Sequence, residues 1–271
     1  MNRIALHCSS FVGKQTGYAQ GTDWDSAVQA VEAYYRPIET YAERFEQLLL
    51  EIKALGYDAL DVWQPGQLDW RWASDEHIRI AREMLTRHNL TVTSYAGEYG
   101  ATREEFNRAC QIAMGIHAPL LSGTTTLLAD DRSFVVKLLK EFDLKLGVEN
   151  HPEKSAREIL EQLGDGGDGR IGTAVDTGWY ATRGADAVRA IEELGDHILH
   201  VHLKDVLPGD EQINVGFGQG CVPLEASVRA LKKIGYRGDY SVEDEGLNHD
   251  PTEELKAALA LVRQWLALPA P

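Results

Sequence analysis

The chain is poor in cysteine, in basic residues and in long apolar runs. Its 271 residues include three cysteines, Cys8, Cys110 and Cys221. Their spacing fits neither a disulfide framework nor a cysteine-rich metal site, so we expect a reducing compartment. No stretch approaches the ~20 consecutive apolar residues that a membrane helix needs, and the first ten residues, MNRIALHCSS, lack the apolar region of a signal peptide. We therefore expect a cytoplasmic protein without a membrane span.

The shortage of positive charge argues against polyanionic partners. Lysine and arginine number 27 against 42 aspartate and glutamate residues, which gives a formal net charge of −15. An acidic surface repels the phosphates of nucleic acids and of anionic membranes. The content of 44% hydrophobic and 25% charged residues is that of an ordinary globular protein. We therefore expect neither nucleic acid nor membrane as partner, whereas the charge says little about a small neutral substrate.

Eight short apolar runs recur along the chain, separated by longer helical patterns. Near-continuous apolar runs are typical of parallel strands that are buried on both faces. Eight such strands, each followed by a helix, predict an α/β fold that closes into a (β/α)8 TIM barrel, with an open doubly wound sheet as the alternative. We find no linker or break in composition, so we expect one domain over residues 1–271. The runs cover residues 4–8, 57–63, 90–97, 118–125, 144–151, 170–178, 197–205 and 238–245.

Apolar residues at three- and four-residue spacing predict the helices between these strands. Ser74 is expected to cap the second helix, and Thr102 with Glu105 forms a capping-box pattern at the start of the third. Residues 9–40 are predicted to form a long irregular segment that shapes the active-site face. The predicted helices cover residues 41–56, 74–89, 102–115, 131–142, 153–163, 184–195, 223–235 and 251–267.

Polar residues end the last four predicted strands, and parallel barrels carry their chemistry at these C-terminal strand ends. Glu149, Asp176, His202 and Glu243 are spaced 27, 26 and 41 residues apart, so each gap spans one strand–helix unit and the four side chains should meet on one rim. Three converging carboxylates repel one another unless a cation joins them. Oxygen ligands with one imidazole suit Mn²⁺, Mg²⁺ or Co²⁺, and Zn²⁺ is also compatible. The alternative is that these acids face solvent.

Neighbouring residues on the same strands are further candidates. Strand alternation puts His200, His202 and Lys204 on one face, with His200 one layer deeper. His200 is either a substrate contact or a hydrogen-bonded core histidine. Lys204 either stabilises developing oxyanion charge or is a solvated lysine. His151 shares the face of Glu149 and is a candidate for proton relay or for binding a hydroxyl group.

Residues near other strand ends are candidates for substrate binding. Trp63 closes the second predicted strand, and Trp179 follows the sixth. Glu98 follows the third strand and His7 lies in the first; either of them lines the pocket or is an ordinary barrel residue. The glycine-rich segment 207–223 after the seventh strand either wraps a phosphate with its backbone amides or forms a lid or turn, and it lacks the G-x-x-x-x-G-K pattern.

Four segments resemble the xylose isomerase-like superfamily of sugar phosphate isomerases and epimerases. They are GVENHP, AVDTGW, HVHLKD and YSVEDEG, in this order and at barrel spacing. The resemblance implies a TIM barrel with a catalytic divalent metal, most often manganese. Carried over residue by residue, the ligands are Glu149, Asp176, His202 and Glu243.

The resemblance also implies the chemistry of a sugar isomerase or epimerase. In such an enzyme a proton leaves the carbon next to a carbonyl, and a metal-stabilised enediolate forms. Glu149 and Glu243 would exchange the proton on opposite faces of the substrate, with His151 and Lys204 as the other catalytic candidates. Substrate binding is assigned to Trp63, Trp179, His200 and Glu98.

Two features leave the reaction open. The ketose 3-epimerase branch of the family has a carboxylate, a histidine and an arginine where this chain has Ser155, Trp179 and Pro208. The HVHLKD and VENH pieces are also similar to the catalytic subunits of bacterial C-deglycosidases, which eliminate the aglycone from 3-keto C-glycosides with a metal and a nearby histidine. A lyase is therefore the alternative to an isomerase or epimerase. The lyase would act with a second subunit, whereas the isomerase would at most form a homo-oligomer.

Two other functions fit the sequence less well. Abasic-site endonucleases share the fold, but they need several metals, more histidine ligands and a basic groove, which the acidic composition disfavours. A non-catalytic sugar-binding protein would usually have lost one metal ligand, and none is missing here.

Overall fold

The computed structural model describes residues 2–151, 153–209 and 213–269; Pro152, the last residue of the GVENHP segment, lies outside them. Eight parallel strands form a closed barrel in chain order, and β8 pairs with β1. The barrel confirms the predicted (β/α)8 fold and excludes the open sheet. The strands are β1 (Ile4–His7), β2 (Ala59–Trp63), β3 (Thr91–Glu98), β4 (Leu120–Thr124), β5 (Lys145–Glu149), β6 (Ile171–Asp176), β7 (Ile198–Leu203) and β8 (Tyr240–Val242).

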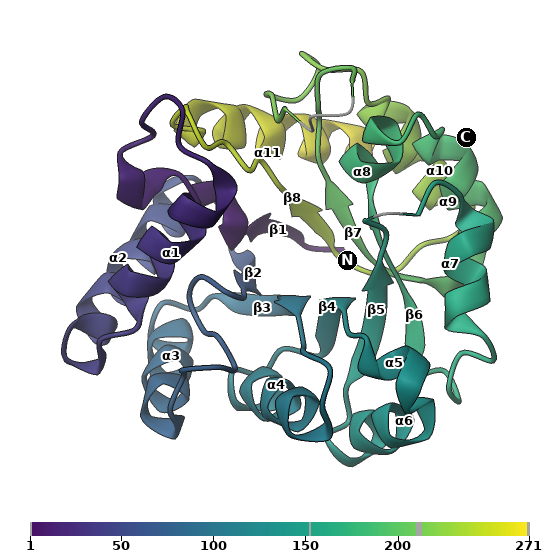
Figure 1. The fold of residues 1–271 in the computed structure, drawn as a ribbon. Helices are drawn as coiled ribbons and strands as arrows, with labels where there is room; N and C mark the ends of the chain where they lie inside the picture. The colour runs from purple at the N-terminus through teal and green to yellow at the C-terminus, as the bar shows by residue number, and fades with distance from the viewer. Residues whose placement is uncertain (1, 152, 210–212, 270–271) are drawn as a thin grey trace.

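Helices surround the barrel (Figure 1), and the N-terminal pair lies together on one side of it. They are α1 (Trp24–Tyr35), α2 (Ile38–Ala54), α3 (Asp75–Arg87), α4 (Arg103–Gly115), α5 (Leu127–Asp130), α6 (Arg132–Glu141), α7 (Ala156–Leu163), α8 (Thr177–Thr182), α9 (Ala187–Leu194), α10 (Leu224–Lys233) and α11 (Thr252–Ala267).

Two predicted helix starts are confirmed by their capping contacts. The Thr102 side chain accepts a hydrogen bond from the backbone N of Glu105, and the Glu105 carboxylate accepts one from the backbone N of Thr102. Ser74 caps α3 in the same manner, with His77 as its reciprocal partner. Each side chain satisfies a backbone N–H that the first helical turn leaves without an internal acceptor.

The prediction of an irregular segment over residues 9–40 is wrong for much of its length. The segment contains two short 3-10 helices, Cys8–Phe11 and Lys14–Thr16, followed by α1 and the start of α2. Asp23 caps α1 by accepting a hydrogen bond from the backbone N of Ser26. Ala27, Val31 and Tyr35 are buried at four-residue spacing along its inner face. The sequence of this segment therefore has the apolar periodicity of a helix.

Several strands end earlier than predicted, including β6, which stops at Asp176 close to the site. β5 stops at Glu149, β7 at Leu203, and β8 is only three residues long. The backbone N of Glu243 still donates to Leu203 O at 3.0 Å, so the chain stays in register for one more residue. Glu245 lies beyond the last barrel hydrogen bond and is carried by the loop.

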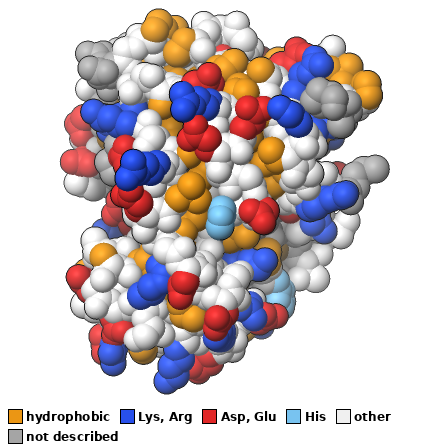
Figure 2. Space-filling view, turned by 90° about the vertical axis from the view of Figure 1, so that its right-hand side faces the viewer, with side chains coloured by type: hydrophobic (Ala, Val, Ile, Leu, Met, Phe, Trp, Pro, Cys, Tyr) orange, Lys and Arg blue, Asp and Glu red, His pale blue; other side chains and the backbone are white. Residues whose placement is uncertain are grey.

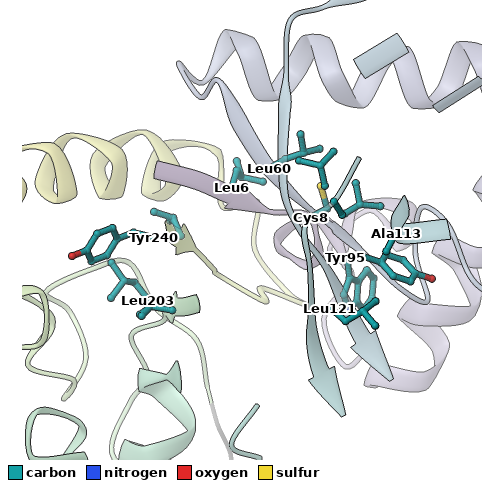
Figure 3. Packing of buried hydrophobic residues seen from close by; sticks show 14 of the residues in the cluster. Leu6, Cys8, Leu60, Tyr95, Ala113, Leu121, Leu203 and Tyr240 are labelled. Carbon is teal, nitrogen blue, oxygen red and sulfur yellow. The ribbon is translucent and has the colours of Figure 1, made fainter. Parts of the chain in front are cut away.

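The strands are buried on both faces, as their apolar composition predicted. Every residue of β2 and of β6 is buried. Figure 3 shows part of the hydrophobic cluster, in which labelled residues such as Leu6, Leu60, Leu121 and Leu203 come from strands of both halves of the chain. All three cysteines are free, in agreement with the absence of a disulfide framework.

The surface shows no gathering of basic side chains on the face seen in Figure 2, where acidic and basic groups are interspersed. In the described part of the chain, no helix combines the length and the apolar character that crossing a membrane requires.

Candidate metal and substrate site

The four predicted ligand residues converge at the C-terminal end of the barrel. Glu149 ends β5, Asp176 ends β6, His202 lies near the end of β7, and Glu243 follows β8. One potential ligand atom of each lies within 4.8 Å of the others, and all four residues are buried. Asp176 and His202 are direct partners across β6 and β7. Strand order and register therefore bring together residues that are far apart in the sequence.

Direct contacts orient these side chains. His202 Nδ1 lies 2.6 Å from Glu149 Oε1 and 3.5 Å from Glu243 Oε2. Asp176 Oδ1 accepts a hydrogen bond of 2.9 Å from the backbone N of Trp179, which caps α8. The Nδ1 side of the imidazole thus faces the carboxylates.

A second polar layer lies beneath the first. His200 is 1% exposed, and its Nε2 is 2.8 Å from Asp61 Oδ2. The same oxygen is 3.8 Å from His202 Nε2, while Thr93 donates to Asp61 Oδ1. This geometry corresponds to the core-histidine alternative for His200, because its ring nitrogen has a protein partner one layer below the rim. Asp61 therefore holds His200 by a hydrogen bond and lies near His202 without hydrogen-bonding to it.

β1 and the residues that follow it form the wall beside Glu243. Ser9 Oγ donates to Glu243 Oε1 at 3.2 Å and lies 2.6 Å from His7 Nδ1. The His7 ring packs edge-on against His202 with a centroid distance of 4.8 Å. Burial lowers the pKa of His7 to about 3, so this imidazole is neutral. His7, Asp61 and His202 also offer atoms within 4.8 Å of one another, but they share His202 with the four-residue set.

Lys204 lies inside the ligand set, and the solvated alternative is wrong for it. Its side chain is 1% exposed, and its Nζ is 3.1 Å from Asp176 Oδ2, 3.0 Å from Glu243 Oε1 and 2.8 Å from Glu245 Oε2. An ammonium group has three N–H donors, and three carboxylates surround this one. To stabilise an oxyanion, the ammonium would have to leave one of these partners.

His151 and Trp179 form the outer edge of the site. His151 Nδ1 is 3.7 Å from Glu149 Oε2, and the histidine side chain is 40% exposed. The Trp179 ring packs against the His151 ring with a centroid distance of 4.9 Å. The Arg183 guanidinium lies over the Trp179 ring, 5.3 Å from its centroid. These residues lie between solvent and the buried carboxylates, as a substrate contact requires.

The two substrate-binding candidates on β2 and β3 lie at strand ends. Trp63 is 5% exposed and packs edge-on against Trp24 of α1 at 5.9 Å. Glu98 is exposed at the end of β3, and its backbone O accepts a hydrogen bond from Trp70 Nε1 at 2.7 Å. Their contact with substrate stays a prediction.

The buried charged groups of the site shift one another's pKa values. Burial opposes the charge of His202, but Glu149 and Glu243 outweigh it and raise the pKa of His202 to about 10. Burial also raises the pKa of Glu243, although Lys204 opposes the change. For Glu149 burial acts in the same direction, but His151 and His202 outweigh it and lower the pKa of this carboxyl group. The two glutamates therefore differ in proton affinity, although the sequence presents them as equivalent.

The donor set fits a divalent cation. Three carboxylates and one imidazole suit Mn²⁺, Mg²⁺, Co²⁺ or Zn²⁺. Glu243 Oε2 is buried and has no hydrogen-bond donor among the residues that the structure describes. A buried carboxylate oxygen without a donor is costly unless a cation is its partner. Glu149, Asp176, His202 and Glu243 are therefore the residues that would hold the ion.

The glycine-rich loop after β7 uses its amides internally. The backbone N atoms of Gly218 and Gly220 donate to Asp205 Oδ2 at 2.8 and 3.0 Å, and that of Val222 donates to Asp205 Oδ1 at 3.1 Å. These three N–H groups are already taken by a protein carboxylate, so the structure favours the turn over the phosphate-binding alternative. Residues 210–212 of the loop lie outside the described part.

Asp61, Ser9 and Asp205 contribute to the site or its loop but were not predicted from the sequence. Asp61 had a usable signal, because a charged residue in the middle of a buried strand needs a partner. Ser9 and Asp205 had none, since a serine after a strand and an aspartate before a loop are common.

Comparison with known proteins agrees with the barrel fold. Residues 49–265 match the family model described as xylose isomerase-like TIM barrel. No significant match was found among curated proteins.

Solved structures with the same fold have low sequence identity to this chain. The IolI protein with a bound zinc atom has a TM-score of 0.71 at 14% identity, covering 98% of this chain and 100% of that one. An L-ribulose 3-epimerase has a TM-score of 0.69 at 18% identity, covering 98% and 95%. A D-allulose 3-epimerase from Methylomonas sp. has a TM-score of 0.69 at 15% identity, covering 97% and 98%. Together with the family match, the closed barrel and the order of the strand-end motifs, this shows that the chain belongs to the xylose isomerase-like TIM-barrel family.

Proposed function

We propose that the protein is a divalent-metal-dependent sugar isomerase or epimerase that moves a proton next to a carbonyl group. The observation that carries the proposal is the convergence of three carboxylates and one imidazole, with ligand atoms within 4.8 Å, at the C-terminal end of the barrel. The epimerases among the structural neighbours support the same reaction class. When bound, a divalent ion would supply Lewis-acid polarisation of the substrate carbonyl. Mn²⁺ is our first choice, followed by Mg²⁺, Co²⁺ and Zn²⁺.

The proposed proton transfers use Glu149 and Glu243 on opposite sides of the substrate. Glu149 Oε2 faces the half-exposed His151 at 3.7 Å, so it is the more accessible oxygen. Glu243 Oε1 is held by Ser9 and Lys204, and its higher pKa suits it to hold a proton. His151 would relay the proton between Glu149 and solvent, and Lys204 stays a candidate through the contacts that it makes with Glu243.

The substrate-binding residues differ from those of the ketose 3-epimerase branch. Ser155 caps α7 by accepting a hydrogen bond from the backbone N of Glu158, and Pro208 is exposed in the loop after β7. Trp179 takes the third position and covers His151. We propose that aromatic contacts from Trp179 and Trp63 replace polar contacts to the sugar, with Glu98 as the remaining binding candidate.

A C-deglycosidase-type lyase is the second candidate, and one observation favours it. His151 is a single half-exposed base 3.7 Å from Glu149, and the Trp179 ring packs beside it. Elimination needs one base rather than two, and a flat aglycone would stack on an indole ring. In that case we propose a second subunit as partner; otherwise the partner is a small sugar, with at most a homo-oligomer. Cytoplasmic location is part of either proposal.

Metal analysis combined with a substrate screen tests the proposed function. We expect one divalent ion per chain after purification in Mn²⁺, and interconversion of isomers when ketoses and inosose-type cyclitols are supplied. Release of a free aglycone from 3-keto glycosides, without isomerisation, would support the lyase instead. A protein that takes up no divalent ion would contradict both.

The affinity for Mn²⁺ is expected to increase with pH. His202 carries a proton in the metal-free site because its pKa is raised to about 10, and that proton must leave before the imidazole can act as a ligand. Below this pKa each binding event therefore releases about one proton, and the association constant should rise about tenfold per pH unit. Competition with a coloured chelator between about pH 6 and 8.5 measures the slope. An affinity that does not change with pH would show that His202 is not a ligand.

A further inference from the structure

Lys204 makes an unusual set of contacts for a lysine next to a candidate metal site. Among the residues that the structure describes, it is the only lysine or arginine that pairs with a ligand carboxylate. Its ammonium touches one oxygen of Asp176 and one of Glu243, and its third partner, Glu245, is outside the ligand set. Two of the three carboxylates that surround the Lys204 ammonium would therefore also bind a metal ion.

The position of Lys204 is built into the fold. Its backbone N donates to Thr177 Oγ1 at 3.0 Å, and Thr177 Oγ1 donates to Lys204 O at 3.1 Å. The aliphatic part of the side chain runs along Gly178, where an added Cβ would lie 2.8 Å from Lys204 Cγ. A side chain at residue 178 would displace the lysine, so the start of α8 leaves room for it. Local packing thus holds the ammonium among the carboxylates.

The charges of the site explain what this ammonium does. Glu149, Asp176 and Glu243 would repel one another if they were buried without a cation. Lys204 supplies one permanent positive charge, whether or not a metal is present. The same charge lies 3.1 Å from Asp176 Oδ2, so it also repels a divalent ion that approaches this oxygen.

We propose that Lys204 is a built-in counter-ion of the ligand carboxylates, which keeps the metal-free site stable and weakens its affinity for a divalent ion. This inference rests on the metal site of the proposed function and assigns Lys204 a role in metal exchange. The lysine holds Glu243 by Oε1, which leaves Oε2 for the ion. A site of this kind is preformed before the metal arrives, and it releases the ion more readily than it would if Asp176 and Glu243 had no ammonium partner.

The test compares Lys204→Met with the unaltered protein, with Mn²⁺ alone as the probe. Methionine keeps an unbranched, flexible side chain only one atom shorter and removes the charge. We expect the melting temperature of the metal-free variant to fall, and the rise in melting temperature on adding Mn²⁺ to become larger. At about pH 8 we expect Mn²⁺ to bind at least about tenfold more tightly, because the repelling charge has gone. Lys256→Met is the matched control, since Lys256 pairs with Glu253 on the surface, and it should change neither quantity.

If Lys204→Met can be purified only in the presence of Mn²⁺, the metal-free variant is too unstable to fold, which is the expected loss of stability at its largest. A second variant then tests the effect on metal affinity. Glu245→Gln removes the partner of Lys204 that is not a metal ligand, so the positive charge is less compensated and Mn²⁺ should bind more weakly. Weaker or unchanged binding in Lys204→Met, or unchanged binding in Glu245→Gln, would overturn the inference.

These outcomes are distinct from failure of the proposed function. If the unaltered protein binds no Mn²⁺, the metal site is wrong, and the melting temperature of metal-free Lys204→Met still reports whether the lysine compensates the carboxylates. If the unaltered protein binds Mn²⁺ and the two variants do not shift its affinity in opposite directions, only the inference about Lys204 is wrong.

Discussion

Replacing His202 with alanine is expected to lower the affinity for Mn²⁺ by at least about 100-fold. Loss of a residue that merely supports a ligand costs roughly 10- to 100-fold in affinity, and His202 is placed as a ligand itself. Its Nδ1 is within 3.5 Å of both Glu149 Oε1 and Glu243 Oε2. Without the imidazole, the site also loses its only nitrogen donor among the four residues.

The change is measured as metal content after gel filtration and as affinity by chelator competition. His197→Ala is the matched control, because His197 is exposed just before the opposite end of the same strand, and it should keep the unaltered affinity. If the His202 variant retains its metal, the four-residue site is not where the ion binds.

The second large effect is expected from Glu149→Gln and Glu243→Gln. Glutamine keeps the shape and one coordinating oxygen but loses the basic oxygen, so each variant should retain some metal. We expect each to lose at least about 100-fold in rate, the lower end of what a general base contributes. Glu253→Gln on the exposed face of α11 serves as the control and should be fully active.

Solvent exchange in D₂O separates the roles of the two glutamates. If one abstracts the proton and the other returns it from the far face, one variant should still exchange the substrate α-proton without forming product. We expect this variant to be Glu243→Gln, because Glu149 has the oxygen that faces the half-exposed His151. A lyase would need only one of them, so the other variant would remain substantially active once saturated with metal. If both variants turn over at the unaltered rate with metal bound, neither is the base, and His151 becomes the leading candidate.

The sequence predicted the barrel and the four converging residues for local reasons. Apolar runs such as β2 and β6 show burial on both faces in the composition of a few neighbouring residues. The strand ends, where Glu149 and Asp176 stand, are marked by the change from apolar to polar residues. Once the repeat is known, the geometry of a barrel places successive strand ends on one rim. The α1 helix was missed although Ala27, Val31 and Tyr35 are buried at four-residue spacing along it.

The sequence by itself therefore determined the fold class, the family motifs and the convergence of the four strand-end residues, and only the tertiary structure decided how they meet and which other residues join them. Closure of the barrel brings side chains of non-adjacent strands together, as when His200 of β7 reaches Asp61 of β2. Closure of the barrel buried Lys204 among three carboxylates and made Glu149 and Glu243 inequivalent. Such contacts depend on distances of a few ångströms between strands far apart in the chain. Local patterns of polarity carry no information at that scale, because the same pattern fits a lysine in solvent and a lysine in a buried ion pair.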